Sequence, residues 1–282
     1  MLDVLLEPFA LGFMRRALAG CLALSVAAPP LGVFLVLRRM SLMSDVLQHG
    51  VLPGIAVGAI VAGLSVWAMG LGGIVAGLTV AMMAGWLARR TGGKEDSQLA
   101  GMYLVALAAG VALISMQHGI DLTHLLFGNV LAVDDPALVG MAAAATVTLL
   151  VLSVIWRPLV LESLDPGFVA ATGGRGGLWH LLFLTLVVLC VVSGFVALGT
   201  LMAVGLMMLP AIAARHWSDS LAGQVRAAVL VACLSSFGGL VASYYFNIPA
   251  GPSIVLTAGA FWIVSLLLGP RAGLWRQAIP SA

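Results

Sequence analysis

Charge is what this sequence has least of. Only 9% of its 282 residues are Asp, Glu, Lys or Arg, whereas 62% are hydrophobic. A soluble domain usually carries about 25% charged residues. A soluble fold of this composition could not cover its own surface, so an ordinary soluble domain is excluded. The net charge of +2 is also too small to indicate a nucleic-acid partner.

Cysteine and enzyme motifs are scarce as well. Cys21, Cys190 and Cys233 lie far apart in apolar stretches, without metal-ligand spacing or a disulfide framework, so we interpret them as buried packing thiols. The run 91–94 resembles a phosphate-binding loop but lacks its first glycine and the Ser/Thr after Lys94. ATP hydrolysis is therefore expected on a separate chain. No His-Glu-x-x-His motif of a zinc hydrolase is present.

Long charge-free runs are abundant instead. A helix needs roughly 20 apolar residues to cross a hydrocarbon layer about 30 Å thick, and several runs have this length. We predict an all-α, polytopic transmembrane helix bundle of about 8–9 membrane segments, with residues 1–282 forming one transmembrane domain. The predicted spans are 14–37, 46–64, 66–88, 97–117, 136–156, 178–197, 199–214, 226–246 and 252–269.

Glycine and proline predict three irregular places in these spans. We place the turn between the second and third spans near Gly63. Pro29 and Pro30 are expected to kink the first span. The segment 199–214 reaches only about 24 Å at 1.5 Å per residue, so we expect a broken or partly re-entrant helix there.

Positive residues predict the orientation. If the loop after the first span is cytoplasmic and the spans alternate, 11 of the 13 Lys and Arg residues face the cytoplasm, as the positive-inside rule requires. The 118–135 loop then lies outside. Arg15 and Arg16 are the exceptions. They leave open whether the N-terminus lies outside, with nine crossings, or whether the chain crosses eight times.

The outer loop and the stretch 38–58 hold candidate metal ligands. His118 and His124 lie in the outer loop among aspartates; we interpret this as a solvated loop that attracts cations, with a chelating cluster as the alternative. Asp45 and His49 are four residues apart, so they share one face of a helix. Carboxylate and imidazole both bind divalent first-row metals. The alternative is that Asp45 caps the helix and His49 is a satisfied core histidine.

The string RRMSLMSDVLQHGVLPG at 38–54 resembles the signature of the ABC-type zinc/manganese permease family, in which an Asp and a His at this spacing follow an arginine pair. Three further stretches match in order: KEDSQLAGMYLVALAAGVALIS followed by DLTHLLFGNVL, GTLMAVGLMMLPAIAAR, and SYYFNIPAGPSIVL. The resemblance covers nearly the whole chain. It implies the membrane subunit of a metal-ion ABC importer, in which Asp45 and His49 bind the transported Zn²⁺ or Mn²⁺ and no cofactor is tightly held.

The resemblance also implies partners: a cytoplasmic ATP-binding subunit, an extracytoplasmic metal-binding protein and a second permease copy, as a homodimer or with a sister permease, in the bacterial plasma (inner) membrane. Segment 162–175 resembles the element that docks on the ATPase, with Asp165 and Gly173 at matching positions, although Gly167 and Val169 depart from the family pattern.

Two serines are candidates for lining a pore. Ser235 and Ser243 lie in a charge-free helix. Hydrogen bonds to neighbouring helices explain them equally well, because a hydroxyl within a membrane span needs a partner.

We therefore predict the permease subunit of an ATP-driven importer of divalent metal ions, without enzyme activity of its own. Zinc is favoured over manganese, because two ligands from each of two protomers would supply the four of tetrahedral zinc. The alternatives are a permease for a metal chelate such as haem or a siderophore, an intramembrane metalloenzyme, which would need more ligands, and a proton-coupled transporter, which would need more acids within its spans.

Overall fold

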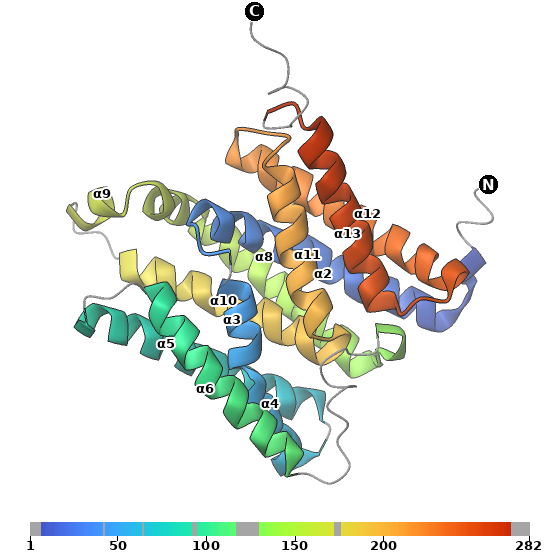
Figure 1. The fold of residues 1–282 in the computed structure, drawn as a ribbon, viewed down its shortest axis with the longest axis horizontal. Helices are drawn as coiled ribbons and strands as arrows, with labels where there is room; N and C mark the ends of the chain where they lie inside the picture. The colour runs from blue at the N-terminus through green and yellow to red at the C-terminus, as the bar shows by residue number, and fades with distance from the viewer. Residues whose placement is uncertain are drawn as a thin grey trace, which may run out of the picture.

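The computed structural model describes residues 7–41, 43–63, 65–91, 95–116, 130–171 and 176–271, and within these ranges all regular structure is helical (Figure 1). In chain order the helices are η1 (Glu7–Ala10), α2 (Gly12–Leu37), α3 (Met43–Gly50), α4 (Leu52–Ala62), α5 (Val66–Thr91), α6 (Glu95–Ser115), η2 (Val130–Ala132), α8 (Asp135–Leu164), α9 (Pro166–Ala171), α10 (Gly176–Leu198), α11 (Thr200–Ala214), α12 (Leu221–Phe246) and α13 (Ala250–Leu268). The predicted helix bundle is confirmed.

The predicted spans reappear in order. Among the described residues, seven helical segments are long and apolar enough to cross a membrane, and Ala100–Ser115 and Thr200–Ala214 are shorter apolar helices. The largest difference is α8, which continues to Leu164 instead of ending at 156. Loss of hydrophobicity marks where a chain leaves lipid, whereas a helix ends only where its backbone hydrogen bonds end.

The irregular places follow backbone chemistry. The turn after α4 is at Gly63, with φ +67°, as predicted. Helix α2 continues through Pro29 and Pro30. Helix α11 is continuous, and only Gly199 separates it from α10. Gly199 has φ +95° and ψ +165°, a region that is essentially restricted to glycine, so this residue lets two helices join without a loop.

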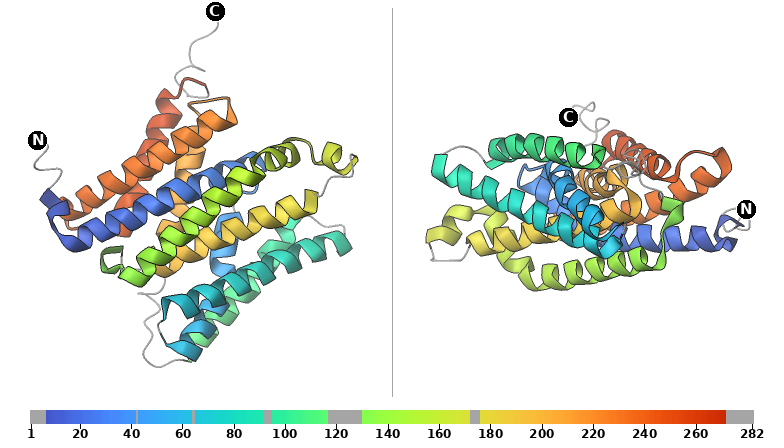
Figure 2. Two further views of the ribbon diagram at one scale, coloured as in Figure 1. Left: turned by 180° about the vertical axis from the view of Figure 1, so that it is seen from behind. Right: turned by 90° about the horizontal axis from the view of Figure 1, so that it is seen from below.

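Helices α2, α10 and α11 occupy the interior. Figure 2 shows α12 and α13 on one side of α2, with α4, α5 and α6 on the other side of the molecule. Phe34 of α2 is fully buried and makes edge contacts with Trp156 of α8, at 5.3 Å between ring centroids, and with Phe183 of α10, at 6.1 Å. These aromatic contacts join α2, α8 and α10 into the core.

Helices α4 and α5 pack backbone to backbone. A Cβ atom on Gly54 would collide with the carbonyl oxygen of Gly72, and one on Gly72 with that of Gly54. A Cβ atom on Gly58 would likewise collide with the carbonyl oxygen of Ala68. Small residues allow such close approach in lipid, where hydrophobic burial does not drive helix association.

Candidate metal site

The candidate site begins at the end of α2, which closes with a Schellman motif. The Met40 N–H donates to the Leu35 carbonyl at 2.9 Å, and the Arg39 N–H donates to Val36 at 3.1 Å, as this motif requires. Arg39 occupies the left-handed position, with φ +58°, where glycine is usual. The chain therefore turns sharply between α2 and α3.

Helix α3 carries both candidate ligands. Asp45 lies in its first turn and His49 in its last. Their side chains lie on one face, with Asp45 Oδ1 3.8 Å from His49 Nε2. Two ligands about 2.1 Å from a tetrahedral metal are about 3.4 Å apart, so a shift of a few tenths of an ångström would let both atoms bind one ion. The expected shared face is confirmed.

The path from α2 to His49 is shorter than one continuous helix would make it. A helix running from Arg39 would place His49 about 15 Å further along the axis. Residues 39–41 form a turn instead, and the helix begins at Met43, so His49 lies only about 9 Å along α3. The tight turn after α2 shortens the path, which hydropathy alone does not reveal.

Helix α3 also carries buried polar atoms without hydrogen-bond partners. Among the described residues, the atoms His49 Nδ1, Gln48 Oε1 and Ser44 Oγ are buried and have no hydrogen-bond partner. The His49 ring lies 5.6 Å from the ring of Tyr103 on α6. No group of three or more His, Cys, Asp or Glu side chains forms a metal site within the part of the chain that the structure describes. Within that part of the chain, Asp45 and His49 are therefore two candidate ligands without a third His, Cys, Asp or Glu beside them.

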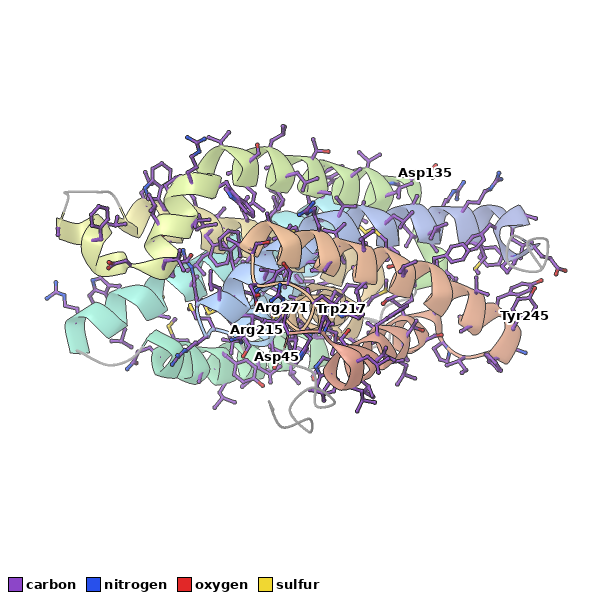
Figure 3. The ribbon with its side chains drawn as sticks, turned by 90° about the horizontal axis from the view of Figure 1, so that it is seen from above. Asp45, Asp135, Arg215, Trp217, Tyr245 and Arg271 are labelled. Carbon is purple, nitrogen blue, oxygen red and sulfur yellow. The ribbon has the colours of Figure 1, made fainter. Side chains whose placement is uncertain are left out.

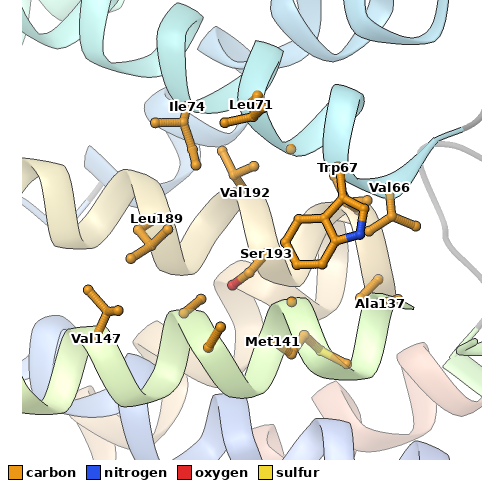
Figure 4. Close-up of a pocket in the computed structure, with 16 residues that line it drawn as sticks. Val66, Trp67, Leu71, Ile74, Ala137, Met141, Val147, Leu189, Val192 and Ser193 are labelled. Atoms are coloured by element: carbon orange, nitrogen blue, oxygen red, sulfur yellow. The ribbon is translucent and has the colours of Figure 1, made fainter. Parts of the chain in front are cut away.

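The cavity in Figure 4 is not a metal site. It has a volume of about 220 Å³ and lies between α5, α8 and α10. Its lining is apolar apart from the Ser193 hydroxyl and the Trp67 indole N–H, and neither Asp45 nor His49 belongs to it. Trp67 and Met141 cover part of it. Such a lining lacks the charged or imidazole ligands that a divalent cation needs.

Asp165 joins α8 to α9. Its N–H donates to the Leu161 carbonyl at 2.9 Å, which closes α8. Its Oδ1 accepts from the Phe168 N–H at 2.9 Å, which caps the start of α9. Its side chain is otherwise exposed. Gly173, the other residue assigned to the ATPase contact, lies outside the described residues.

Both serines assigned to a pore are hydrogen-bonded. Ser235 Oγ donates to the Val231 carbonyl of its own helix at 2.7 Å, and Ser243 Oγ donates to Ile248 at 2.7 Å. Both side chains are buried. The hydroxyls are therefore satisfied within this chain, and their place in a pore stays a prediction.

The acidic loop residues that the structure describes have structural partners. Asp134 caps α8 by accepting from the Ala137 N–H at 3.0 Å, and Asp135 lies 3.4 Å from Arg16 at the start of α2. Figure 3 shows Asp135 and Tyr245 towards the same end of the molecule. His118 and His124 lie outside the described residues. All three cysteines are free thiols, as expected.

A largely buried polar cluster around Arg38 was not predicted from the sequence. Arg38 Nη2 donates to Glu162 at 3.1 Å, Nη1 lies 2.9 Å from His180 Nδ1, and Nε donates to Ser163 at 2.9 Å. The Arg38 guanidinium also lies over the Phe183 ring, at 4.8 Å. One signal was available: His180 is the only ionisable side chain between 176 and 214 apart from a thiol.

Comparisons with known proteins support the family resemblance. The model of the ABC 3 transport family matches residues 10–269. The chain is 33% identical over 95% of its length to a manganese import system permease protein, ScaB, of Streptococcus parasanguinis, covering 95% of that protein. It is 30% identical over 94% of its length to a probable iron transport system membrane protein of Haemophilus influenzae, covering 97% of it.

A solved structure agrees across the whole fold. The structure of PsaBC from Streptococcus pneumoniae in complex with Fab matches with a TM-score of 0.87 and 30% sequence identity, covering 99% of this chain and 100% of that one. The match spans the helix bundle and the segment that carries Asp45 and His49. The chain therefore belongs to the ABC 3 transport family, the family of metal-importer permeases that the sequence resemblance predicted.

Proposed function

We propose that this chain is the permease of an ATP-driven importer of divalent manganese or zinc, and that Asp45 and His49 bind the ion during its passage. One observation carries the proposal. Two ligand atoms lie 3.8 Å apart on one face of a helix that belongs to the apolar span Met43–Ala62. An ionisable residue within a membrane span is costly unless it serves a partner or a pathway.

The exposure of the pair supports a second permease copy. The Asp45 side chain is 55% exposed in the single chain, and that of His49 is 23% exposed. A carboxylate so placed within a membrane span must face water, an ion or another protein. A homodimer would bring two such pairs together and supply four ligands, enough for one divalent ion. A sister permease with a similar pair would serve equally well.

The ion is the finer part of the proposal. Carboxylate oxygen suits manganese and imidazole suits zinc, so the ligand pair fits both. The four-ligand argument favours zinc, whereas the relative at 33% identity is named for manganese. Uptake of each radioactive ion in competition with the other distinguishes them: the preferred ion is the one that blocks uptake of the other at the lower concentration.

The proposed partners supply the two functions that a permease lacks, ATP hydrolysis and metal delivery. A cytoplasmic ATP-binding subunit would dock on the segment around Asp165 and Gly173, and an extracytoplasmic protein would deliver the metal to the outer side of the bacterial plasma membrane. We also propose that Ser235 and Ser243 lie beside the path of the ion. Their buried, bonded hydroxyls would supply no more than a secondary polar lining.

The test removes the ligands one at a time. Asp45→Asn keeps the size of the side chain and removes its charge, and His49→Ala removes the imidazole. Each variant should lower metal uptake by more than about 100-fold, because even partners of a metal ligand typically contribute 10- to 100-fold. Uptake is measured in cells that lack other importers, with expression checked in isolated membranes.

Asp135→Asn is the matched control. It removes an exposed carboxylate that pairs with Arg16, and it should leave uptake unchanged. Normal uptake by the double variant Asp45→Asn/His49→Ala would show that the pair is structural and would remove the proposed mechanism.

A further inference from the structure

The Arg38 cluster joins three chain segments at one point. Arg38 follows the last residue of α2, Glu162 and Ser163 lie in the last turn of α8, and His180 lies in the first turns of α10. The Arg38 and Glu162 side chains are only 9% and 11% exposed. Because a guanidinium only donates, His180 Nδ1 is the acceptor, and each of the three contacts is charge-assisted.

The residues of the cluster lie next to two segments with proposed functions, α9 and the metal-binding helix α3. Glu162 and Ser163 come just before Asp165, the residue that ends α8 and starts α9. Arg38 comes just before Arg39, whose left-handed backbone makes the turn into α3. The cluster therefore links the end of α8, next to α9, to the end of α2, and the α3 helix with Asp45 and His49 begins just beyond it.

Stability alone is a weak reason for this cluster. Burying an ion pair removes both charges from water, and apolar residues of similar size often stabilise a protein as well or better. The described Arg–Asp pairs lie at the surface: the side chains are 55% and 75% exposed in Arg16–Asp135, and 56% and 70% exposed in Arg271–Asp219. The Arg38 guanidinium instead contacts Glu162, Ser163 and His180 at once. Because its donors form a rigid planar fork, these contacts hold the ends of α2, α8 and α10 in one relative position.

We propose that Arg38 is a positioning residue that transmits movement of α9 to the metal-binding helix α3. The inference rests on the proposed function and adds the physical link between ATP hydrolysis and the ion. When the ATPase displaces α9, the last turn of α8 moves with it. Glu162 and Ser163 carry the Arg38 guanidinium along, and the turn at Arg39 converts this movement into a displacement of α3.

The test uses the full complex of permease, ATPase and metal-delivery protein in liposomes. Glu162→Gln keeps the shape and removes the charge, and Arg38→Lys keeps the charge but loses the fork. Each should lower the number of metal ions moved per ATP hydrolysed by about fivefold or more, the lower end of coupling between linked sites. Metal binding by the assembled complex should stay within about twofold of the unaltered protein.

Asp219→Asn, which breaks the exposed pair with Arg271, is the matched control and should leave the ratio unchanged. If Glu162→Gln or Arg38→Lys lowers transport and ATP hydrolysis in parallel, or leaves the ratio unchanged, the cluster is merely structural and the inference is wrong. If either variant fails to assemble, Ser163→Ala replaces it, because this substitution removes one hydrogen bond to Arg38 and no charge. A lower ratio of metal ions moved to ATP hydrolysed then supports the role of Arg38, and an unchanged ratio rejects it.

The two proposals fail separately. An unaltered complex that moves no metal, or a complex that still moves metal without Asp45 and His49, rejects the proposed function. A complex whose transport needs both ligands, but whose Arg38 and Glu162 variants stay coupled, rejects only the link.

Discussion

At the scale of single residues, short polar side chains determine where helices begin. Asp134 caps α8 and Ser220 caps α12, each by accepting a backbone N–H. Asp165 differs because the same residue closes α8 and caps α9. Its proposed role in the ATPase contact therefore has two components: the negative charge that it presents and the short helix that it holds in place.

Two substitutions at Asp165 separate these components. Asp165→Ala removes the cap, which typically stabilises a helix by about 1 kcal/mol, and should weaken transport. Asp165→Asn keeps a good cap without charge and should transport almost normally. ATP-dependent metal uptake in liposomes measures both. Equal loss in the two variants would instead assign the effect to the charge, and Asp134→Ala controls for loss of a cap elsewhere.

At the scale of secondary-structure elements, glycine determines how closely helices approach. Helix α5 contains Gly70 and Gly72 in one apolar stretch. A Cβ on Gly72 would meet the backbone of Gly54, whereas one on Gly70 would meet nothing within 4 Å. Only the packing distinguishes these two glycines.

This difference predicts opposite outcomes for one substitution. Gly72→Ala should destabilise the α4–α5 contact by about 1–3 kcal/mol, the typical effect of overpacking. Gly70→Ala should stabilise the protein by about 0.4–1 kcal/mol, because alanine restricts the unfolded chain and its Cβ would meet nothing within 4 Å. The midpoint of denaturant unfolding in detergent measures both. Equal midpoints for the two variants would contradict the close backbone packing.

At the scale of the whole molecule, α2 and α8 run in the same direction. Arg16 pairs with Asp135 where both helices begin, and Arg38 pairs with Glu162 where both end. The start of α8 follows the acidic loop that the positive residues place outside. If that loop lies outside, the start of α2 lies outside as well. This arrangement favours nine membrane segments over eight and predicts that α9 lies on the cytoplasmic side.

Labelling with a membrane-impermeant maleimide tests this orientation. Asp135 and Asp219 are exposed to a similar extent, 75% and 70%, and Asp219 lies beside the α11–α12 turn, where Arg215, Trp217 and Arg271 gather (Figure 3). In a variant without the three native cysteines, Asp135→Cys should react from outside intact cells and Asp219→Cys only after lysis. The reverse labelling would overturn the orientation.

Much of the architecture was predictable because it depends on local physics. The length of apolar runs, the positions of glycine and the helical period place the spans, the turn at Gly63 and the shared face of Asp45 and His49. These properties involve residues close together in the chain. Helix α8 continues to Leu164, beyond the end of the predicted span at 156, because the end of a helix does not depend on hydropathy alone.

What the sequence determined by itself is thus the membrane class of the protein, the order of its helices and the pair of candidate ligands. Only the tertiary structure decided the rest: the buried cluster of Arg38, Glu162 and His180, the close approach of Gly54 to Gly72, and the exposure of Asp45 on the surface of the single chain. Each of these depends on which residues, distant in sequence, the folded helices bring together, and no local pattern specifies that choice.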